Sequence, residues 1–191
     1  MKFTRIPTDT FKKLQLNAGI FARKFNVESG EVAEENLLGA TSGGANFSAV
    51  PTFRDDGEDI DNCPKNMMEL KRLERWEITI GGTLITVDTA AAKDLVAACD
   101  VAGNKVTPRN DLKLEDFKDI WWIGDYSDEN GDATGGFIAI RLMNALSTGG
   151  FTMQSGDRAK GQFNFSYTAH YSMDAQETVP FEIYVQAGTG A

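Results

Sequence analysis

The alternation of apolar and polar residues is strongest near the carboxyl end of the chain, in the segment QFNFSYTAHYSM (162–173). Apolar, mostly aromatic residues occupy every second position, and the positions between them include Gln162, Asn164, Ser166, Thr168 and His170. A two-residue period is typical of a β-strand with one buried face. At about 3.4 Å per residue, this segment predicts a strand of roughly 40 Å. Its polar face is expected to point away from the core of the fold.

Four further segments share the two-residue period and are bounded by Gly, Asn or Asp: 14–22, 76–87, 137–143 and 181–186. Together they predict a mainly β fold, either a sandwich or an open barrel. The segment DTAAAKDLVAACD (88–100) differs, because its apolar residues, Cys99 included, recur at three- and four-residue spacing behind a potential N-cap, Asp88. This pattern predicts one helix packed on the sheet. A short helical turn is expected at 111–117.

The segment 39–66 is dense in Gly, Asn, Asp and Pro. A loop longer than about 15 residues is uncommon inside a compact domain and is usually functional or disordered. Its spaced apolar residues, Phe47, Val50, Phe53 and Ile60, favour a hairpin or arm that contacts an apolar surface, on this subunit or another. We predict a long extended loop that contacts other subunits. The candidate contact residues are Thr41, Gly43, Gly44, Phe47, Phe53, Asp55, Asp56, Glu58 and Asp59.

A length of 191 residues predicts a single domain spanning 1–191. The chain has 28 acidic and 19 basic residues, for a net charge of −9, which disfavours tight binding of DNA phosphates. The basic cluster of Lys71, Arg72 and Arg75 is interpreted as an exposed approach to a strand. Two cysteines without CxxC spacing indicate neither a disulfide framework nor a zinc site. Because no apolar stretch or signal core is evident, we expect no targeting segment and no membrane association.

Two acidic segments resemble metal-binding loops at first sight. DYSDENGD (125–132) places carboxylates at alternating positions, as a calcium loop does, but the Glu at position twelve and the flanking helices are missing. DDGEDID (55–61) has the same deficiency. Since Asp, Asn and Gly also favour turns, both are interpreted as hairpin loops. If the DYSDENGD segment binds calcium instead, the alternative function is a calcium-dependent β-sandwich binding module.

Catalytic motifs find little support in the sequence. His170 is the only histidine, which excludes a site with several histidine ligands and leaves a Cys63–His170 dyad as one open alternative. The alternation places His170 on the polar face of a strand, which favours a surface histidine. No GxSxG, P-loop or GxGxxG motif is present. We therefore expect no enzyme activity and no metal or cofactor.

The adjacent residues Trp121 and Trp122 present a packing problem. Neighbouring residues of a strand point to opposite faces, so only one of the two indoles can face a given core. The other needs cover from a helix or from a neighbouring chain. Both are therefore candidates for a subunit interface, where aromatic residues are enriched.

Several segments together resemble the major tail tube protein family of long-tailed bacteriophages and related prophages. They are NAGIF, GATSGG, DGEDIDNCPKN, PRNDLKLEDFKDIWWIGDYSDENG, GGFIAIRLMNALSTGGF, GQFNFSYTAHYSMD and VPFEIYV. The likeness runs from Leu14 to Val185 and lies in the order and spacing of the segments rather than in any one of them.

The resemblance implies a β-sandwich or half-barrel with one flanking helix, of which six copies close into a ring. Stacked rings would form the hollow tail tube, with a continuous inner β-barrel, a long loop reaching the adjoining ring, and DNA passing through the channel. The implied partners are further copies of the chain and the tape measure, tail terminator and tail-tip proteins. The implied location is the virion tail, assembled in the cytoplasm of the bacterial host. The acidic composition fits a channel wall that does not hold phosphates. In such a tube, the polar face of Gln162, Asn164, Ser166, Thr168 and His170 would face either the lumen or the outside.

Overall fold

The computed structural model describes residues 5–7, 9–126 and 136–188. In these residues the chain is mainly β, with a single α-helix, α1 (Thr89–Val96), and four short 3₁₀ turns at Thr10–Lys13, Glu34–Asn36, Met68–Leu70 and Leu114–Asp116. The strands are β1 (Gln15–Ala22), β2 (Thr41–Asp55), β3 (Lys71–Leu84), β4 (Cys99–Ala102), β5 (Lys105–Pro108), β6 (Lys118–Tyr126), β7 (Phe137–Ser147), β8 (Phe163–Thr168) and β9 (Phe181–Gln186).

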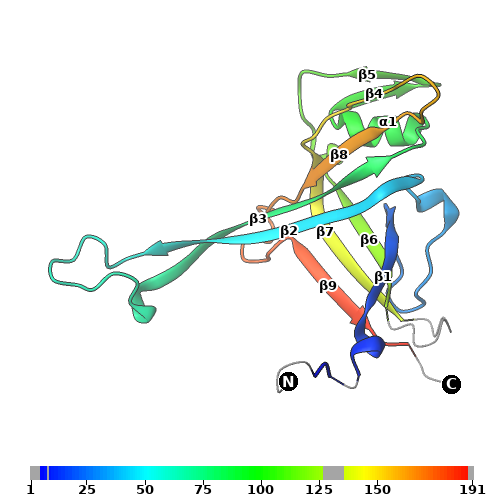
Figure 1. Ribbon diagram of the computed structural model, residues 1–191. Coiled ribbons are helices and arrows are strands. Elements are labelled where there is room, and N and C mark those ends of the chain that lie inside the picture. Colours follow the sequence, from blue (N-terminus) through cyan, green and yellow to red (C-terminus); the bar gives the residue numbers. More distant parts are fainter. Residues whose placement is uncertain (1–4, 8, 127–135, 189–191) are drawn as a thin grey trace.

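Strand β7 joins two antiparallel arrays. One of its edges pairs with β6, which in turn pairs with β1. Its other edge is divided, because Phe137–Leu142 pairs with β9 whereas Leu146 and Ser147 pair with β8. The order β1-β6-β7-β8-β3-β2 therefore carries β9 as a branch, and the small β4–β5 hairpin lies beside α1 (Figure 1). The predicted mainly β fold with one helix is confirmed at this level.

Two apolar clusters lie on opposite faces of the β1-β6-β7 array. The larger cluster includes residues from both arrays and from α1: Phe21, Leu38, Ile78, Ile80, Leu84, Leu95, Ile120, Trp122, Ile140, Leu142, Ala145, Phe163, Phe165 and Tyr167. The smaller cluster contains Ala22, Trp121, Ile123, Phe137 and Ala139, and the 25–32 segment and Tyr184 cover it. The β1-β6-β7 array is therefore buried on both faces, which is why β6 reads as an apolar run rather than as an alternation.

Helix α1 begins as the sequence predicts. The Asp88 carboxylate accepts a hydrogen bond from the backbone N–H of Ala91 at 2.6 Å, which is an N-cap contact. Ala91 and Leu95 are buried against the sheet. The helix is shorter than predicted, however, because Ala97 takes a positive φ of 65° and Cys99 begins β4 instead of continuing the helical face. At 111–117, the expected helical turn is the 3₁₀ turn Leu114–Asp116.

The prediction of one strand over 162–173 is wrong in length. Its first half forms β8, with Phe163, Phe165 and Tyr167 buried as the alternation indicated. Beyond Thr168 the position beside β7 is occupied by β9, whose first residue, Phe181, pairs with Leu142. The chain therefore leaves the ladder after Thr168, and a wall strand of roughly 40 Å does not form from this segment.

At 39–66 the chain belongs to a hairpin, one of the predicted forms, but its loop conformation is corrected, because most of the segment is the 15-residue strand β2. Gly43 and Gly44, with φ of 83° and 80°, lie where the pairing register shifts between Thr41 and Ala45. Pro51 is tolerated because β2 pairs only with β3 in the described chain and is thus an edge strand. The Gly and Pro content that suggested a loop reflects a bulged edge strand instead. Turn-favouring residues form an actual loop only at the tip, 56–67.

Candidate assembly surface

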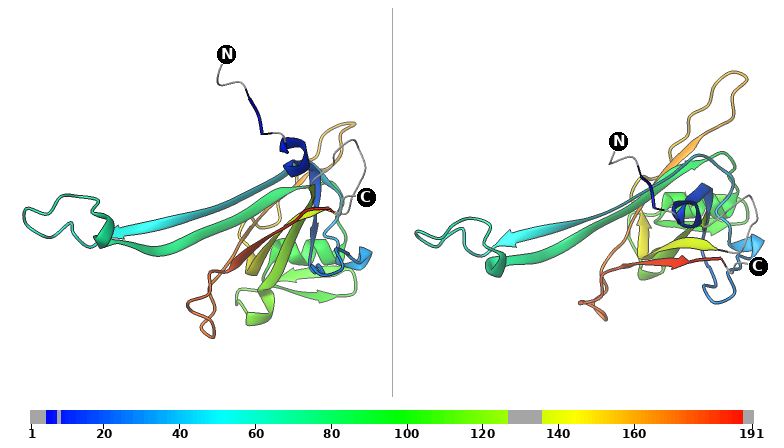
Figure 2. Two further views of the ribbon diagram at one scale, coloured as in Figure 1. Left: turned by 90° about the horizontal axis from the view of Figure 1, so that it is seen from below. Right: turned by 60° about the horizontal axis from the view of Figure 1, so that its bottom comes forward.

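The hairpin of β2 and β3 projects from the body of the protein. The two strands pair from Thr41 opposite Leu84 to Asp55 opposite Lys71. Strand β8 supports β3 only from Thr79 to Leu84. Beyond this support the hairpin extends away from the rest of the fold, as Figures 1 and 2 show. We call residues 50–77 the arm.

One face of the arm continues the apolar core of the body. Phe47 and Ala49 pack against the larger cluster, and side chains on alternate residues of β2 share a face, so Pro51 and Phe53 extend that face outward. Trp76, opposite Pro51, contacts Phe181 with ring centroids 5.7 Å apart.

A register shift in the arm keeps this face apolar. Thr52 pairs with Arg75 and Phe53 pairs with Leu73, so Glu74 is the extra residue of a bulge. Without that bulge, Glu74 rather than Leu73 would pair with Phe53. Phe53 and Leu73 are 53% and 51% exposed. The apolar face of the arm, formed by Pro51, Phe53, Leu73 and Trp76, is thus open to a partner along its outer half.

The opposite face of the arm carries charges that are paired within the arm. Arg75 forms an ion pair with Glu77 at 3.0 Å. Asp56 forms ion pairs with Arg54 at 2.7 Å and with Arg72 at 3.8 Å. These pairs are exposed, so each contributes little to stability. The basic cluster that the sequence analysis interpreted as an approach to a strand is the exposed outer part of β3 itself.

Asp55 closes the tip of the arm. Its carboxylate accepts backbone hydrogen bonds from Gly57 at 3.0 Å and from Asn66 at 2.8 Å, across the two ends of the turn region. These bonds lower the pKa of Asp55 from its ordinary value. Ile60 and Met68 remain 53% and 82% exposed nearby. The acidic DDGEDID segment is therefore a turn held by its first carboxylate, in agreement with the turn interpretation.

The predicted contact residues all fall on this one hairpin. Thr41, Gly43, Gly44 and Phe47 lie at its base beside the body, Phe53 and Asp55 lie in the arm, and Asp56, Glu58 and Asp59 lie in the turns of the tip. Leu73 and Trp76, which complete the apolar face from β3, were not among the predicted contact residues. The alternation of 76–87 predicted a strand that begins at Trp76, but β3 begins five residues earlier, at Lys71. An extension of that strand towards the N-terminus would have included Leu73.

The polar strand face is spread over two environments. Gln162 and Asn164 are exposed, whereas Ser166 and Thr168 are half-buried. Asn164 accepts from Thr83 at 2.8 Å, and Thr168 shares a 2.8 Å contact with Thr148. His170 lies beyond the strand, with its ring edge against Phe117 and Nδ1 3.2 Å from the Asn144 carbonyl oxygen.

Two further strand edges lack a neighbour in the described chain. β9 pairs only with β7, and Ile183 and Val185 on it are 51% and 56% exposed. β1 pairs with β6 on one side and, on the other, makes only a bridge from Ala22 to Leu37. Open edges of this kind are templates for pairing with another chain unless they are protected.

Trp121 and Trp122 point to opposite faces, as the alternation predicts. Trp122 belongs to the larger cluster, where its Nε1 donates to the Ala18 carbonyl at 3.1 Å. Gly19, with φ of 69°, makes room for it, because a Cβ there would meet the indole at 2.5 Å. Trp121 belongs to the smaller cluster and stacks on Tyr184 at 5.7 Å. The chain itself covers both indoles, which are 6% and 8% exposed, so neither presents much surface to a neighbour.

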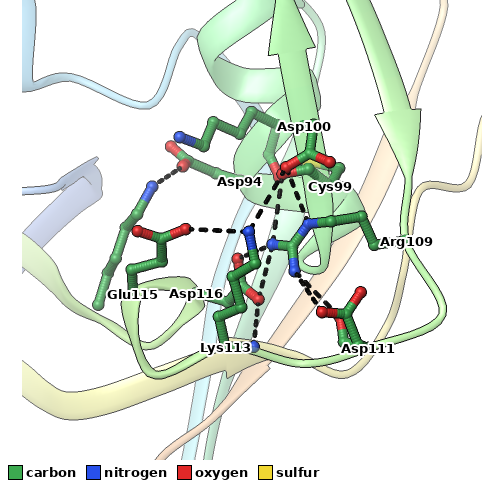
Figure 3. Close-up of polar contacts among 10 residues, drawn as sticks. Asp94, Cys99, Asp100, Arg109, Asp111, Lys113, Glu115 and Asp116 are labelled. Carbon is green, nitrogen blue, oxygen red and sulfur yellow. Dashed lines mark hydrogen bonds and ion pairs between the residues drawn. The ribbon is translucent and has the colours of Figure 1, made fainter.

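A dense charged cluster lies between α1, the β4–β5 hairpin and the 114–116 turn (Figure 3). Arg109 donates to both carboxylate oxygens of Asp116, at 2.7 and 3.0 Å, and forms ion pairs with Asp100 and Asp111. Burial opposes its charge, but the three carboxylates outweigh burial and raise the pKa of Arg109. An arginine held by carboxylates in this way offers neither a base nor a nucleophile. Through Arg109 and Asp116, the cluster connects the end of β5 to the Leu114–Asp116 turn. No pattern in the sequence predicts this cluster.

The chemical candidates are not brought together. Cys63 lies in the tip of the arm and contacts Pro64 and Met67, whereas His170 contacts Phe117 and Asn144 in the body. Among the described residues, no group of three or more His, Cys, Asp or Glu side chains is placed to hold a metal. Residues 127–132 of the DYSDENGD segment lie outside the described part.

Comparison with known proteins gives no relative. A scan of protein-family models and a search of curated proteins both found no match for this chain. In the described part, the longest helix is α1 with eight residues, well below the roughly 20 that a membrane-spanning helix needs.

Proposed function

We propose that this chain is a tail tube subunit of a long-tailed bacteriophage or prophage. It assembles with copies of itself into rings, six to a ring as the resemblance implies, and the rings stack into a hollow conduit for DNA. The observation that carries the proposal is the arm, which extends the apolar core of one subunit into solvent and leaves Phe53 and Leu73 about half exposed. A monomer gains nothing from such a surface, but a neighbouring subunit can bury it.

The open edges of β1 and β9 support the same proposal. In a closed ring, each subunit can pair one of its edges with the next subunit, which satisfies backbone groups that would otherwise promote uncontrolled association. An arm that reaches from one ring to the next is a heterologous contact, and heterologous contacts that do not close produce an open filament. Edge pairing and arm contact thus serve the two directions of assembly, within a ring and along the tube.

Electron microscopy tests the proposal directly. The purified protein, concentrated and negatively stained, is expected to show rings or long hollow tubes. A protein that remains monomeric at all concentrations, and whose melting temperature rises with added calcium, contradicts the proposal and supports the binding-module alternative.

Shortening the arm tests its role separately. Because Phe47 and Ala49 pack on the core, deletion of all of 41–53 would damage the body as well. A sharper variant replaces residues 53–74 with Asn-Gly, which joins the paired residues Thr52 and Arg75 through a short turn. We expect a folded subunit that does not form tubes. Normal tubes from this variant would contradict the assignment of the arm. Rings that do not stack into tubes would support it, because edge pairing within a ring does not need the arm.

A further inference from the structure

A small cavity lies where α1 meets the sheet. Lys93 and Asp94 of α1 line it on one side, and Lys118, Ser147 and Tyr167 of β6, β7 and β8 line it on the other. Its volume is about 10 Å³. A buried water needs roughly 10–15 Å³ and two to four polar partners. The cavity therefore has the size of one water molecule.

The Tyr167 hydroxyl, on a residue that lines this cavity, is buried and has no hydrogen-bond partner among the described residues. The same holds for Nη2 of Arg23, whose Nε donates to Asp94. The side chain of Tyr167 is 2% exposed, so bulk water does not reach its hydroxyl. Burial, and secondarily the charge of Asp94, raise the pKa of Tyr167, while Arg23 opposes them weakly. The hydroxyl thus keeps its proton and can donate a hydrogen bond.

Asp94 is the acceptor around which these groups gather. Its two carboxylate oxygens accept hydrogen bonds from Arg23 Nε at 2.6 Å and from Lys118 Nζ at 3.0 Å. Its side chain is only 5% exposed. A carboxylate has about four lone-pair positions, so capacity remains after these two contacts. An anion in the cavity would meet the carboxylates of Asp94 and Asp116, and a cation would meet Lys93 and Lys118. The lining favours a neutral ligand.

We propose that this cavity is a binding site for a single water molecule, which accepts from the Tyr167 hydroxyl and donates to Asp94. The water links β8 to α1. It adds a second polar contact between helix and sheet. The first is the hydrogen bond that the Ser147 hydroxyl donates to the Leu95 carbonyl oxygen at 2.8 Å. Because Ala91 and Leu95 are the only residues of this eight-residue helix that are buried, polar contacts carry much of its attachment. The inference is independent of tube formation.

Replacing Tyr167 with Phe distinguishes a bound water from an unpaired hydroxyl. Loss of a hydroxyl that holds a water should lower the melting temperature, by about 2–4 °C for a chain of this size. Removal of a buried hydroxyl without a partner should leave it unchanged or raise it. Tyr184→Phe is the control, because the Tyr184 hydroxyl donates directly to Glu182 at 2.6 Å and its loss sets the scale for a satisfied group.

A high-resolution crystal structure of the unaltered protein gives the second measurement. We expect a density peak within hydrogen-bond distance of both the Tyr167 hydroxyl and an Asp94 oxygen. An empty cavity, or a Tyr167→Phe variant that is at least as stable as the unaltered protein, would overturn the proposal. Because the crystal structure uses the unaltered chain, it tests the proposal even if the variant does not fold.

Discussion

Replacing Phe53 and Leu73 with serine tests whether assembly depends on the apolar face of the arm. The two residues face each other across the arm and are 53% and 51% exposed. A Phe side chain buries about 150–250 Å², so roughly 100 Å² of Phe53 is available to a partner, worth about 2.5 kcal/mol. The exposed half of Leu73 adds about 1 kcal/mol.

The expected loss is therefore about 3.5 kcal/mol per arm contact, which weakens each association by roughly 10²–10³-fold. The subunit itself should lose at most about 1 kcal/mol of unfolding free energy, because only one exposed cross-strand pair is removed. Sedimentation velocity over a range of protein concentrations measures the threshold for assembly, and chemical denaturation measures the stability of the subunit. We expect the threshold to rise by at least two orders of magnitude while the subunit stays folded.

Val50→Ser provides the matched control. Val50 has the same exposed fraction as Phe53, 53%, but lies on the opposite face of β2, next to the paired charges. It should leave the assembly threshold nearly unchanged. If both variants shift the threshold equally, or if the double variant assembles like the unaltered protein, the apolar face is not the contact and the reasoning from exposure fails.

Three further predictions concern the subunit. Trp121→Ala and Trp122→Ala should each lower the free energy of unfolding by about 3–5 kcal/mol in chemical denaturation, because each leaves a cavity in a separate cluster; a loss below about 1 kcal/mol would contradict either placement. Asp88→Ala should cost about 1 kcal/mol by the same measurement and Asp88→Ser much less, since serine can also cap the helix. The folded-state pKa of Asp55 is depressed, so its hold on the tip is complete above its ordinary value of 3.8 and is lost as pH falls through the lower folded value. The protection factors of the two bound amides, which correct for the intrinsic pH dependence of exchange, should therefore fall only in acid, and Asp55→Asn should remove that fall.

Local patterns in the sequence predict local features well. Strand β9 has the predicted bounds, Asp88 caps the predicted helix, and the two tryptophans separate onto two faces. Each of these depends on residues close together in the chain, through side-chain alternation or a capping contact. The identity of the groups that cover Trp121 could not be read in the same way, because Phe25 and Tyr184 come from distant segments.

The errors arise where a strand depends on its neighbours. The alternation of 162–173 continues past Thr168, but β9 takes the place on β7 that a longer β8 would need. Conversely, the Gly- and Pro-containing segment 41–55 is extended because β3 pairs with it along its whole length. The glutamate bulge that aligns Leu73 with Phe53 has no local signal at all. Register is a property of two strands, and one strand's sequence does not contain it.

The way β3 is anchored determines how the arm can bear mechanical load. Six residues of β3, Thr79–Leu84, pair with β8 along the same line in which the arm projects. Backbone hydrogen bonds in an antiparallel ladder run perpendicular to the strands. A pull along the arm therefore strains all of these bonds together in shear, instead of opening them one after another as a sideways peel would. An arm anchored in this way resists stretching along its axis, which is the load that a contact between stacked rings of the proposed tube would place on it.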